Sequence, residues 1–225
     1  MADSDDEGDK KDYQIKVVVL GDGTTGKTSL ITRFSQNHFG KTYQQTVGLD
    51  FFLKRILLPG DVHVTLQVWD IGGQTIGGKM IDNYVSGAEA VLFIYDITNY
   101  TSFENLDDWL AVVKRTFRGA TKLPHMALVG NKSDLEHMRT VRKDRHEKFA
   151  KDNHMSSHSI SAKTSDKVNN CFKQVAADVL HIKLTPAYLE ETDAVITADV
   201  VRHTPHQSMP TKLTTKTRSS VCVLQ

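Results

Sequence analysis

A glycine-rich segment between an apolar run and a helical pattern constrains the fold of this chain most. It reads Gly-Asp-Gly-Thr-Thr-Gly-Lys-Thr over residues 21–28, which is the spacing G-x-x-x-x-G-K-[ST]. The β-rich run before it predicts a strand, and Leu30, Ile31 and Phe34 after it keep helical spacing. Glycines in such a turn let backbone N–H groups converge on an anion, next to the positive end of the new helix. The segment therefore predicts a phosphate-binding loop for a nucleoside triphosphate.

Separate roles can be assigned within this loop. Lys27 can reach the β- and γ-phosphates, and the Thr28 hydroxyl can bind Mg²⁺. A strand-to-helix turn with an incidental lysine is the alternative, and the next motif argues against it. The positions that we expect to contact the phosphates are Gly21, Asp22, Gly23, Thr24, Thr25, Gly26, Lys27, Thr28 and Ser29.

A second motif indicates which base is bound. Asn131-Lys132-Ser133-Asp134 follows an apolar strand pattern, so it lies where open α/β sheets bind ligands. The ionised Asp134 carboxylate can accept hydrogen bonds from the N1–H and the exocyclic amine of guanine, whereas adenine offers no donors there. Ser161-Ala162-Lys163 can then supply a backbone N–H to the guanine oxygen. Each segment alone is a common turn, but their order behind a phosphate-binding loop predicts a guanine nucleotide.

The order of apolar patterns predicts an α/β fold. The short turn at residues 59–61 implies an antiparallel pair, and the later strand patterns alternate with helical ones. We therefore expect a mostly parallel, doubly wound six-stranded sheet of the P-loop NTPase type, with one antiparallel edge strand and helices on both faces. The expected strands are residues 13–20, 49–57, 62–68, 90–95, 125–130 and 158–160, and the expected helices include residues 27–36, 103–117 and 168–180.

Taken together, these motifs resemble the Ras superfamily of small GTPases, closest to the Rab branch. The resemblance covers residues 13 to about 182 and also rests on Thr46-Val47-Gly48 and on Trp69-Asp70-Ile71-Gly72-Gly73-Gln74. It implies a G domain over residues 13–183 that binds GTP or GDP with Mg²⁺ and hydrolyses GTP. It also implies an exchange factor, a GTPase-activating protein and effectors as partners, with the protein itself a monomer.

Individual roles follow from the same resemblance. Thr46 matches the threonine of switch I that closes over Mg²⁺ and the γ-phosphate, and Asp70 matches the residue that holds Mg²⁺ through water. Gly73 matches the glycine whose N–H contacts the γ-phosphate, and Gln74 the glutamine that orients the attacking water. Phe39 takes the place of the aromatic side chain on the guanine edge, although an ordinary core phenylalanine fits its position nearly as well. The implied catalytic residues are Gln74, Lys27 and Thr46.

The chain departs from the Rab pattern at switch II. Most Rab-like chains read Trp-Asp-Thr-Ala-Gly-Gln-Glu, whereas the double glycine here is more similar to the Arf branch, which begins Met-Gly rather than Met1-Ala2. We assign no arginine beside the switches to catalysis, and we expect Arg33 and Arg55 to face solvent. Hydrolysis should therefore be slow and depend on the activating protein. The alternatives are a GTP-binding scaffold that barely hydrolyses GTP and an ATP-dependent P-loop enzyme.

Both ends of the chain differ in composition from the middle. Residues 1–12 carry six acidic side chains and two lysines, and we expect them to be disordered. Residues 184–225 are expected to form a flexible tail, in which residues 187–201 can be partly helical. The tail ends Cys222-Val-Leu-Gln, a C-a-a-X box for prenylation of Cys222. One lipid gives only reversible attachment, which four basic side chains in residues 201–225 can reinforce. This ending predicts a prenyltransferase and a prenyl-binding solubilising factor as further partners.

These features place the expected protein on the cytoplasmic face of membranes, with a cytosolic pool. Plasma membrane, endomembrane and the cilium base are the candidate locations, and membrane trafficking is the expected process. No apolar run approaches the roughly 18 residues of a membrane span, and no basic and aromatic array suggests nucleic-acid binding. Two cysteines do not form a disulfide framework, and Cys171 is expected in the core. We expect His137, His146, His154 and His158 at the surface.

Overall fold

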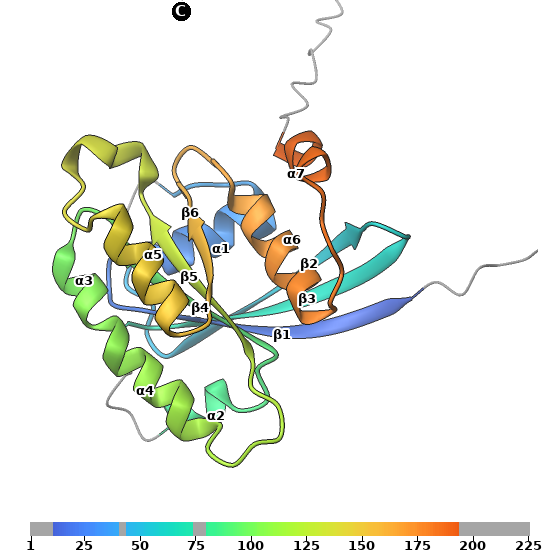
Figure 1. Ribbon diagram of the computed structural model, residues 1–225, viewed down its shortest axis with the longest axis horizontal. Helices are drawn as coiled ribbons and strands as arrows, with labels where there is room; N and C mark the ends of the chain where they lie inside the picture. The colour runs from blue at the N-terminus through green and yellow to red at the C-terminus, as the bar shows by residue number, and fades with distance from the viewer. Residues whose placement is uncertain (1–10, 41–43, 74–79, 194–225) are drawn as a thin grey trace, which may run out of the picture. The chain divides into compact units, whose positions relative to one another are not determined.

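The computed structural model describes residues 11–40, 44–73 and 80–193, and only the backbone of residues 191–193. Six strands form one sheet in the order β2-β3-β1-β4-β5-β6 (Figure 1). The strands are β1 (Asp12–Leu20), β2 (Leu49–Leu58), β3 (Val62–Ile71), β4 (Ala90–Asp96), β5 (His125–Asn131) and β6 (Ser156–Ser159).

Strand pairing follows the connections between the strands. The short turn after β2 makes β2 and β3 antiparallel, with Phe51 opposite Trp69. All other pairs are parallel, and the central strand β1 lies between β3 and β4, with Val17 beside Val68 on one side and Ala90 on the other. The predicted fold class, a mostly parallel sheet with one antiparallel edge strand, is confirmed.

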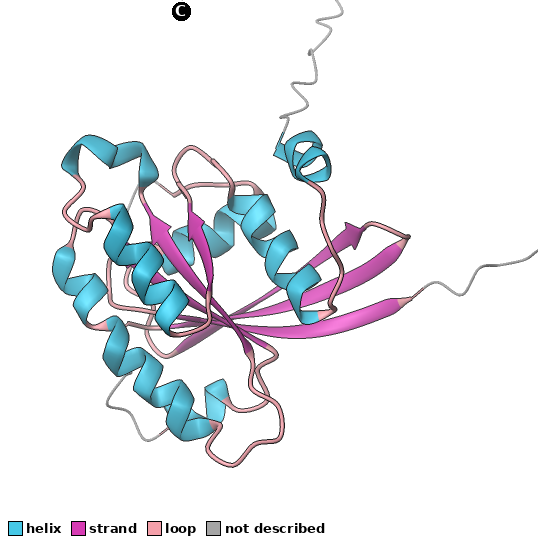
Figure 2. Ribbon diagram, in the orientation of Figure 1, coloured by secondary structure: helices cyan, strands magenta, loops and turns pink. Residues whose placement is uncertain are grey.

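Helices connect the strands and cover both faces of the sheet (Figure 2). The expected helix over residues 103–117 is divided at Asn105, and the side chain of Asn99 caps the first part by accepting a hydrogen bond from Ser102 N (3.4 Å). The helical elements are α1 (Lys27–Gln36), α2 (Ile81–Val85), α3 (Tyr100–Glu104), α4 (Leu106–Thr116), the 3₁₀ helix η1 (Ser133–Met138), α5 (Lys143–Asp152), α6 (Val168–Val179) and α7 (Pro186–Asp193).

Two elements differ from the sequence-based expectation. Strand β6 begins at Ser156 rather than at His158, because its pairing with β5 places Ala127 beside Ser156 and Gly130 beside Ser159. Its side chains are all polar, so hydrophobic alternation could not reveal it. The expected flexible tail begins with the helix α7, where the Tyr188 hydroxyl donates a hydrogen bond to the Leu57 carbonyl of β2 (2.6 Å).

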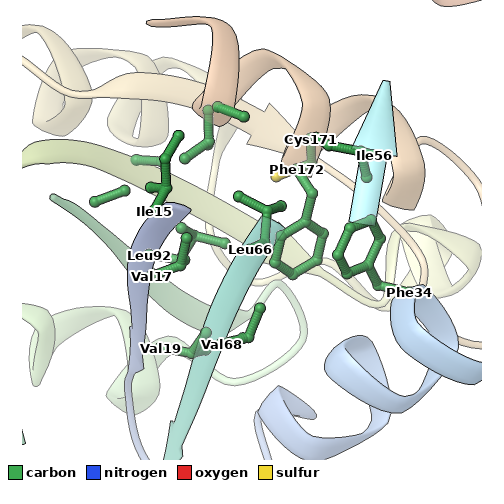
Figure 3. Close-up of a cluster of buried hydrophobic side chains, with 14 of the residues drawn as sticks. Ile15, Val17, Val19, Phe34, Ile56, Leu66, Val68, Leu92, Cys171 and Phe172 are labelled. Atoms are coloured by element: carbon green, nitrogen blue, oxygen red, sulfur yellow. The ribbon is translucent and has the colours of Figure 1, made fainter. Parts of the chain in front are cut away.

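The core has two layers because successive side chains of β1 point to opposite faces. Ile15, Val17 and Val19 pack toward α1 and α6, where the rings of Phe34 and Phe172 stack with centroids 3.9 Å apart (Figure 3). Val18 and Leu20 pack on the other face, toward α2, α4 and α5. Cys171 lies in the first layer as expected, and burial raises the pKa of its thiol to about 12. Residues 17–20 of β1 are thus buried on both faces, which fixes the end of the strand that carries the glycine-rich loop.

The histidines around β6 are not all surface residues. His146 is only 6 % exposed, and its ring contacts the Tyr95 hydroxyl (2.9 Å) and the Ser157 hydroxyl (2.8 Å). His158 is half-buried, and its Nε2 lies 3.0 Å from the Ser156 hydroxyl. The expectation for these two residues was wrong, because a short polar strand beside α5 provides hydroxyl partners that make buried imidazole rings tolerable. His137 and His154 are exposed.

These buried rings predict a loss of stability in mild acid. Burial, with smaller effects of His125 and His146, lowers the pKa of His158 to about 4, and burial also lowers the pKa of His146. The unfolded chain therefore binds more protons than the folded one between pH of about 6.5 and 4, so stability falls as the pH drops through this window. His158 alone accounts for a fall of up to about 3 kcal/mol in the free energy of unfolding across this window.

Urea unfolding of the GDP-loaded protein from pH 7.5 to 4.5 measures this effect. We expect His158→Gln to flatten the decline below pH 6.5, while the control His154→Gln, at an exposed position, keeps the wild-type slope. Equal slopes in all three proteins would contradict the assignment.

Candidate nucleotide-binding site

A cavity of about 840 Å³ opens at the carboxyl ends of β1 and β5, where parallel sheets bind ligands. Its volume suits a nucleotide-sized molecule. Six lining residues were not assigned from the sequence: Thr32, His38, Gly40, Gln44, Gln45 and Leu135. The sequence-predicted residues that line it are Gly23, Thr24, Gly26, Lys27, Thr28, Ser29, Phe39, Thr46, Gly73, Asn131, Lys132, Asp134, Ala162 and Lys163.

The glycine-rich loop forms the floor of this cavity between β1 and α1. Gly26 has a φ of 93°, and a Cβ there would lie 2.4 Å from Nδ2 of Asn131, so only glycine fits. Lys27 is 5 % exposed, and its Nζ donates hydrogen bonds to the carbonyls of Gly21 (2.7 Å) and Asp22 (2.8 Å). Burial lowers the pKa of Lys27 to about 8. A phosphate beside this ammonium would favour its charged form and raise the pKa again.

Three predicted loop residues support the cavity from behind instead of lining it. The Asp22 carboxylate points to α4, where it accepts hydrogen bonds from Asn105 Nδ2 (2.6 Å) and from the indole Nε1 of the buried Trp109 (2.9 Å). Gly21 contributes the carbonyl that holds Lys27, and Thr25 contributes the carbonyl that holds Asn131 (2.9 Å). A spacing motif cannot distinguish these supporting roles, since it records positions and not directions.

Three oxygen-bearing side chains meet beside Lys27. The Thr28 hydroxyl donates a hydrogen bond to Asp70 Oδ2 (2.5 Å) and lies 2.7 Å from the Thr46 hydroxyl. Asp70 is fully buried, its other oxygen has no hydrogen-bond partner among the described residues, and burial raises the pKa of the carboxyl. A buried carboxyl group with one unpaired oxygen and two hydroxyls nearby suits a hard divalent cation, because the cation would stabilise the charged form of the carboxyl group. The residues present therefore fit Mg²⁺.

The double glycine lies against the segment that carries Thr46. Gly72 N donates a hydrogen bond to the Gly48 carbonyl (3.0 Å), and a Cβ on Gly72 would lie 2.5 Å from the Thr46 carbonyl oxygen. A Cβ on Gly73 would lie 2.2 Å from the backbone nitrogen of Gly23 in the glycine-rich loop. The departure from the Rab pattern thus permits a close approach of two segments. Gln74, assigned to catalysis, lies outside the described residues, as does Cys222.

The two segments predicted to recognise the base are joined at the other end of the cavity. Asn131 is 1 % exposed, and its Oδ1 accepts a hydrogen bond from the Ala162 N–H (3.1 Å). Asp134 accepts a hydrogen bond from the Ser161 hydroxyl (2.6 Å), and Lys163 Nζ lies 3.7 Å from its other oxygen. The ends of β5 and β6 therefore form one unit with a carboxylate aimed along the cavity rim.

Three other expectations can be compared with the structure. Phe39 lines the cavity, as expected of an aromatic side chain on the guanine edge, and it also packs on the core, as an ordinary core phenylalanine would. Arg55 is exposed as expected and pairs with Asp12 (2.6 Å). Arg33 faces solvent only in part: it is half-buried and donates hydrogen bonds to the carbonyls of Ala162 and Lys163, both at 3.1 Å. No pattern in the sequence indicated this contact, because it joins residues 130 positions apart.

Comparison with known proteins agrees with this geometry. The model of the Ras family matches residues 16–181. The chain is 47 % identical over 207 residues to the Ras-related protein Rab-28 of Caenorhabditis elegans, covering 92 % of this chain and 82 % of that protein. It is 34 % identical to Rab-13 of Rattus norvegicus and 36 % identical to Rab-8B of Pongo abelii, each over 75 % of this chain and 81 % and 80 % of those proteins. A glycine-rich phosphate loop, an aligned base-recognition unit and these matches lead to one conclusion: the chain belongs to the Ras family and is a Rab-like small GTPase.

Proposed function

We propose that this GTPase is a membrane-recruited switch in membrane trafficking, which binds effectors in its GTP state and hydrolyses GTP slowly. The observation that supports it most is the contact of the Thr46 hydroxyl with Thr28 (2.7 Å) and Asp70 (3.4 Å). Thr46 belongs to a cavity-lining loop, so its position links a surface segment to the phosphate end of the site. Through such a link, the presence or absence of the γ-phosphate can determine whether that surface segment is ordered.

The reaction in this proposal is in-line attack of water on the γ-phosphate of GTP. Lys27 holds the β- and γ-phosphates, Gly73 N–H contacts the γ-phosphate, and Gln74 orients the water. Thr28, Thr46 and, through water, Asp70 would hold Mg²⁺, which would supply positive charge beside the phosphates. No arginine lines the cavity among the described residues, and Arg33 lies against Ala162 and Lys163 at the base end. An activating protein would therefore supply the missing charge, and intrinsic turnover would be slow.

An apolar surface beside Thr46 supports effector recruitment. Val47 is 88 % exposed, and Phe51 and Leu53 of the edge strand β2 are 49 % and 59 % exposed. Phe51 also packs edge-to-face on Trp69, with the ring centroids 5.7 Å apart, so it is held in place at the surface. Contiguous exposed apolar side chains on a sheet edge are typical of partner sites. Because Val47 follows Thr46 directly, a partner bound here would sense the state of the site.

Substituting Gln74→Leu tests the hydrolysis step. We expect GDP and GTP binding to remain, while hydrolysis stimulated by an activating protein falls at least about tenfold, because the leucine cannot orient water. Single-turnover release of phosphate from loaded GTP, with and without cell extract, measures both rates. Hydrolysis by Gln74→Leu at the wild-type stimulated rate would contradict the role of Gln74. Wild-type protein that fails to respond to extract would favour the alternative, a GTP-binding scaffold tethered to membranes.

The membrane anchor in this proposal is a prenyl group on Cys222, in the C-a-a-X box of a tail that spans residues 184–225. Residues 1–12 form an acidic segment in this scheme and residues 13–183 the G domain. In the described part of the chain, no helix combines the length and apolarity needed to cross a bilayer. A prenyltransferase would add the lipid, and a prenyl-binding factor would keep a cytosolic pool of a protein that is otherwise monomeric.

Membrane fractionation of Cys222→Ser tests this anchor. We expect the variant to move to the cytosolic fraction. One prenyl chain and a few basic side chains together give only reversible membrane binding, and the lipid supplies the larger part of the binding energy. Cys171→Ser is the matched control, since Cys171 is buried and cannot carry a lipid in the folded protein. An unchanged membrane fraction for Cys222→Ser would show that lipid is not the anchor.

A further inference from the structure

Arg33 of α1 is placed where it can control the base end of the site. Its guanidinium donates from Nε to the Ala162 carbonyl and from Nη2 to the Lys163 carbonyl, both at 3.1 Å. Its third nitrogen, Nη1, donates to the Asn37 carbonyl at the end of α1 (3.1 Å). One half-buried side chain thus joins two consecutive peptide groups of the base-recognition loop to the helix that starts at the phosphate-binding loop.

The two carbonyl contacts orient the peptide planes of that loop. In a planar trans peptide the C=O and the following N–H point in opposite directions, so fixing a carbonyl fixes the direction of the next N–H. Arg33 therefore sets the Lys163 N–H by holding the Ala162 carbonyl. The following peptide is held at both ends, since the Thr164 N–H donates to the Ser161 hydroxyl (3.1 Å) while Arg33 holds the Lys163 carbonyl. A donor loop for a base oxygen needs this kind of fixed geometry.

The same guanidinium also reaches the aromatic wall of the cavity. Its central carbon lies 5.8 Å from the centroid of the Phe39 ring, within the range of a cation–π contact. Phe39 lines the cavity and is only partly buried, so it depends on such neighbours for its position. Arg33 therefore contacts both Phe39 and the loop with Ala162 and Lys163.

We propose that Arg33 is a positioning residue for guanine binding, which locks the loop of residues 161–163 and Phe39 into one frame and so sets how slowly the nucleotide dissociates. This inference rests on the proposed guanine nucleotide site. A lysine would not replace it, because a different nitrogen of the planar guanidinium holds each of the Ala162, Lys163 and Asn37 carbonyls, and a single ammonium nitrogen cannot occupy all three positions. The effect acts on the base end and leaves the phosphate end, with Lys27 and Thr28, unchanged.

The test compares Arg33→Met, Arg33→Lys and the control Arg55→Met, whose arginine is exposed and pairs only with Asp12 at 2.6 Å among the described side chains. Release of fluorescent GDP is followed in excess unlabelled GDP with Mg²⁺ present. We expect GDP release to be about tenfold faster from Arg33→Met, with little rescue in Arg33→Lys. The release rate of Arg55→Met should lie within about twofold of wild type, because only the substitutions of Arg33 remove charge-assisted hydrogen bonds to the loop.

A second measurement separates positioning from general weakening. Competition by 6-thioguanosine diphosphate, which keeps the N1–H and the exocyclic amine of guanine but carries sulfur, a weaker acceptor, in place of the 6-oxygen, gives the preference for that oxygen. This preference should fall in Arg33→Met by about the factor seen in the release rate. Unchanged release, full rescue by lysine, or faster release with an unchanged preference would each overturn the proposal. If wild-type protein binds no GDP, the proposed guanine site itself is wrong. If wild type and Arg33→Met bind and release GDP equally, only the role of Arg33 is wrong.

Discussion

Replacing Asp134 by asparagine should weaken GDP binding by about 10³- to 10⁴-fold, the largest loss that we expect from one substitution. The carboxylate can accept hydrogen bonds from both the N1–H and the exocyclic amine of guanine, whereas an amide offers a donor where one acceptor is needed. The Ser161 hydroxyl can still donate to the amide oxygen, as it does to Asp134 at 2.6 Å, so the loop should keep its shape. The loss should therefore come from the base contact and not from misfolding.

Competition with labelled GDP measures this loss, and xanthosine diphosphate gives a second readout. Xanthine carries a carbonyl in place of the exocyclic amine, so it should bind Asp134→Asn better than it binds wild type. Glu136→Gln is the matched control, because Glu136 undergoes the same change on the exposed side of η1, where it pairs with Arg139 (2.8 Å). Asp134→Asn that binds GDP within tenfold of wild type would exclude this carboxylate from base recognition.

Replacing Lys27 by methionine should weaken GDP binding by about 10²- to 10³-fold. Methionine keeps most of the apolar length of the side chain but removes a buried ammonium whose hydrogen bonds to phosphate would be charge-assisted, worth about 1.5–3 kcal/mol each. Lys27 already holds the carbonyls of Gly21 and Asp22, so its head is fixed at the loop before any phosphate arrives. This preorganisation is the reason for expecting a large effect.

The rise in melting temperature on adding GDP reports this effect without any catalysis. The rise should be large in wild type and nearly lost in Lys27→Met, since stabilisation by a ligand follows its affinity. Lys114→Met is the control, because Lys114 is exposed on α4 and donates to Asn153 Oδ1 (3.3 Å), far along the chain from the loop. A full GDP-dependent rise in Lys27→Met would remove Lys27 from the phosphate site.

Much of the fold could be predicted because the informative patterns are local. Strand β1 and helices α1 and α6 carry dense apolar spacing, and the structure places these side chains in the core. Strand β6 was misplaced for the opposite reason: residues 156–159 are serines and a histidine, and only pairing with β5 makes them a strand. Helix α7 has a weak apolar pattern too, and its Tyr188 is held by a carbonyl from β2.

The candidate site divides in the same way. Motif spacing selected the residues that surround the cavity, from Lys27 to Asp134 and Lys163, because those types are demanded by phosphate and guanine chemistry. Spacing could not tell that the Asp22 side chain turns away to Trp109, since a motif does not encode direction. It also assigned Arg33 and His146 to the surface, because their partners lie in distant segments.

The sequence alone determined the family, the kind of ligand and the succession of most strands and helices along the chain, because each depends on residue types at fixed local distances. Only the tertiary structure decided which side chains share an environment. It joined Thr46 to Thr28 and Asp70, and it placed Arg33 on the carbonyls of Ala162 and Lys163. These contacts bring together residues 18 to 130 positions apart. They arise because the fold places segments that are distant in the chain side by side, which no local pattern encodes.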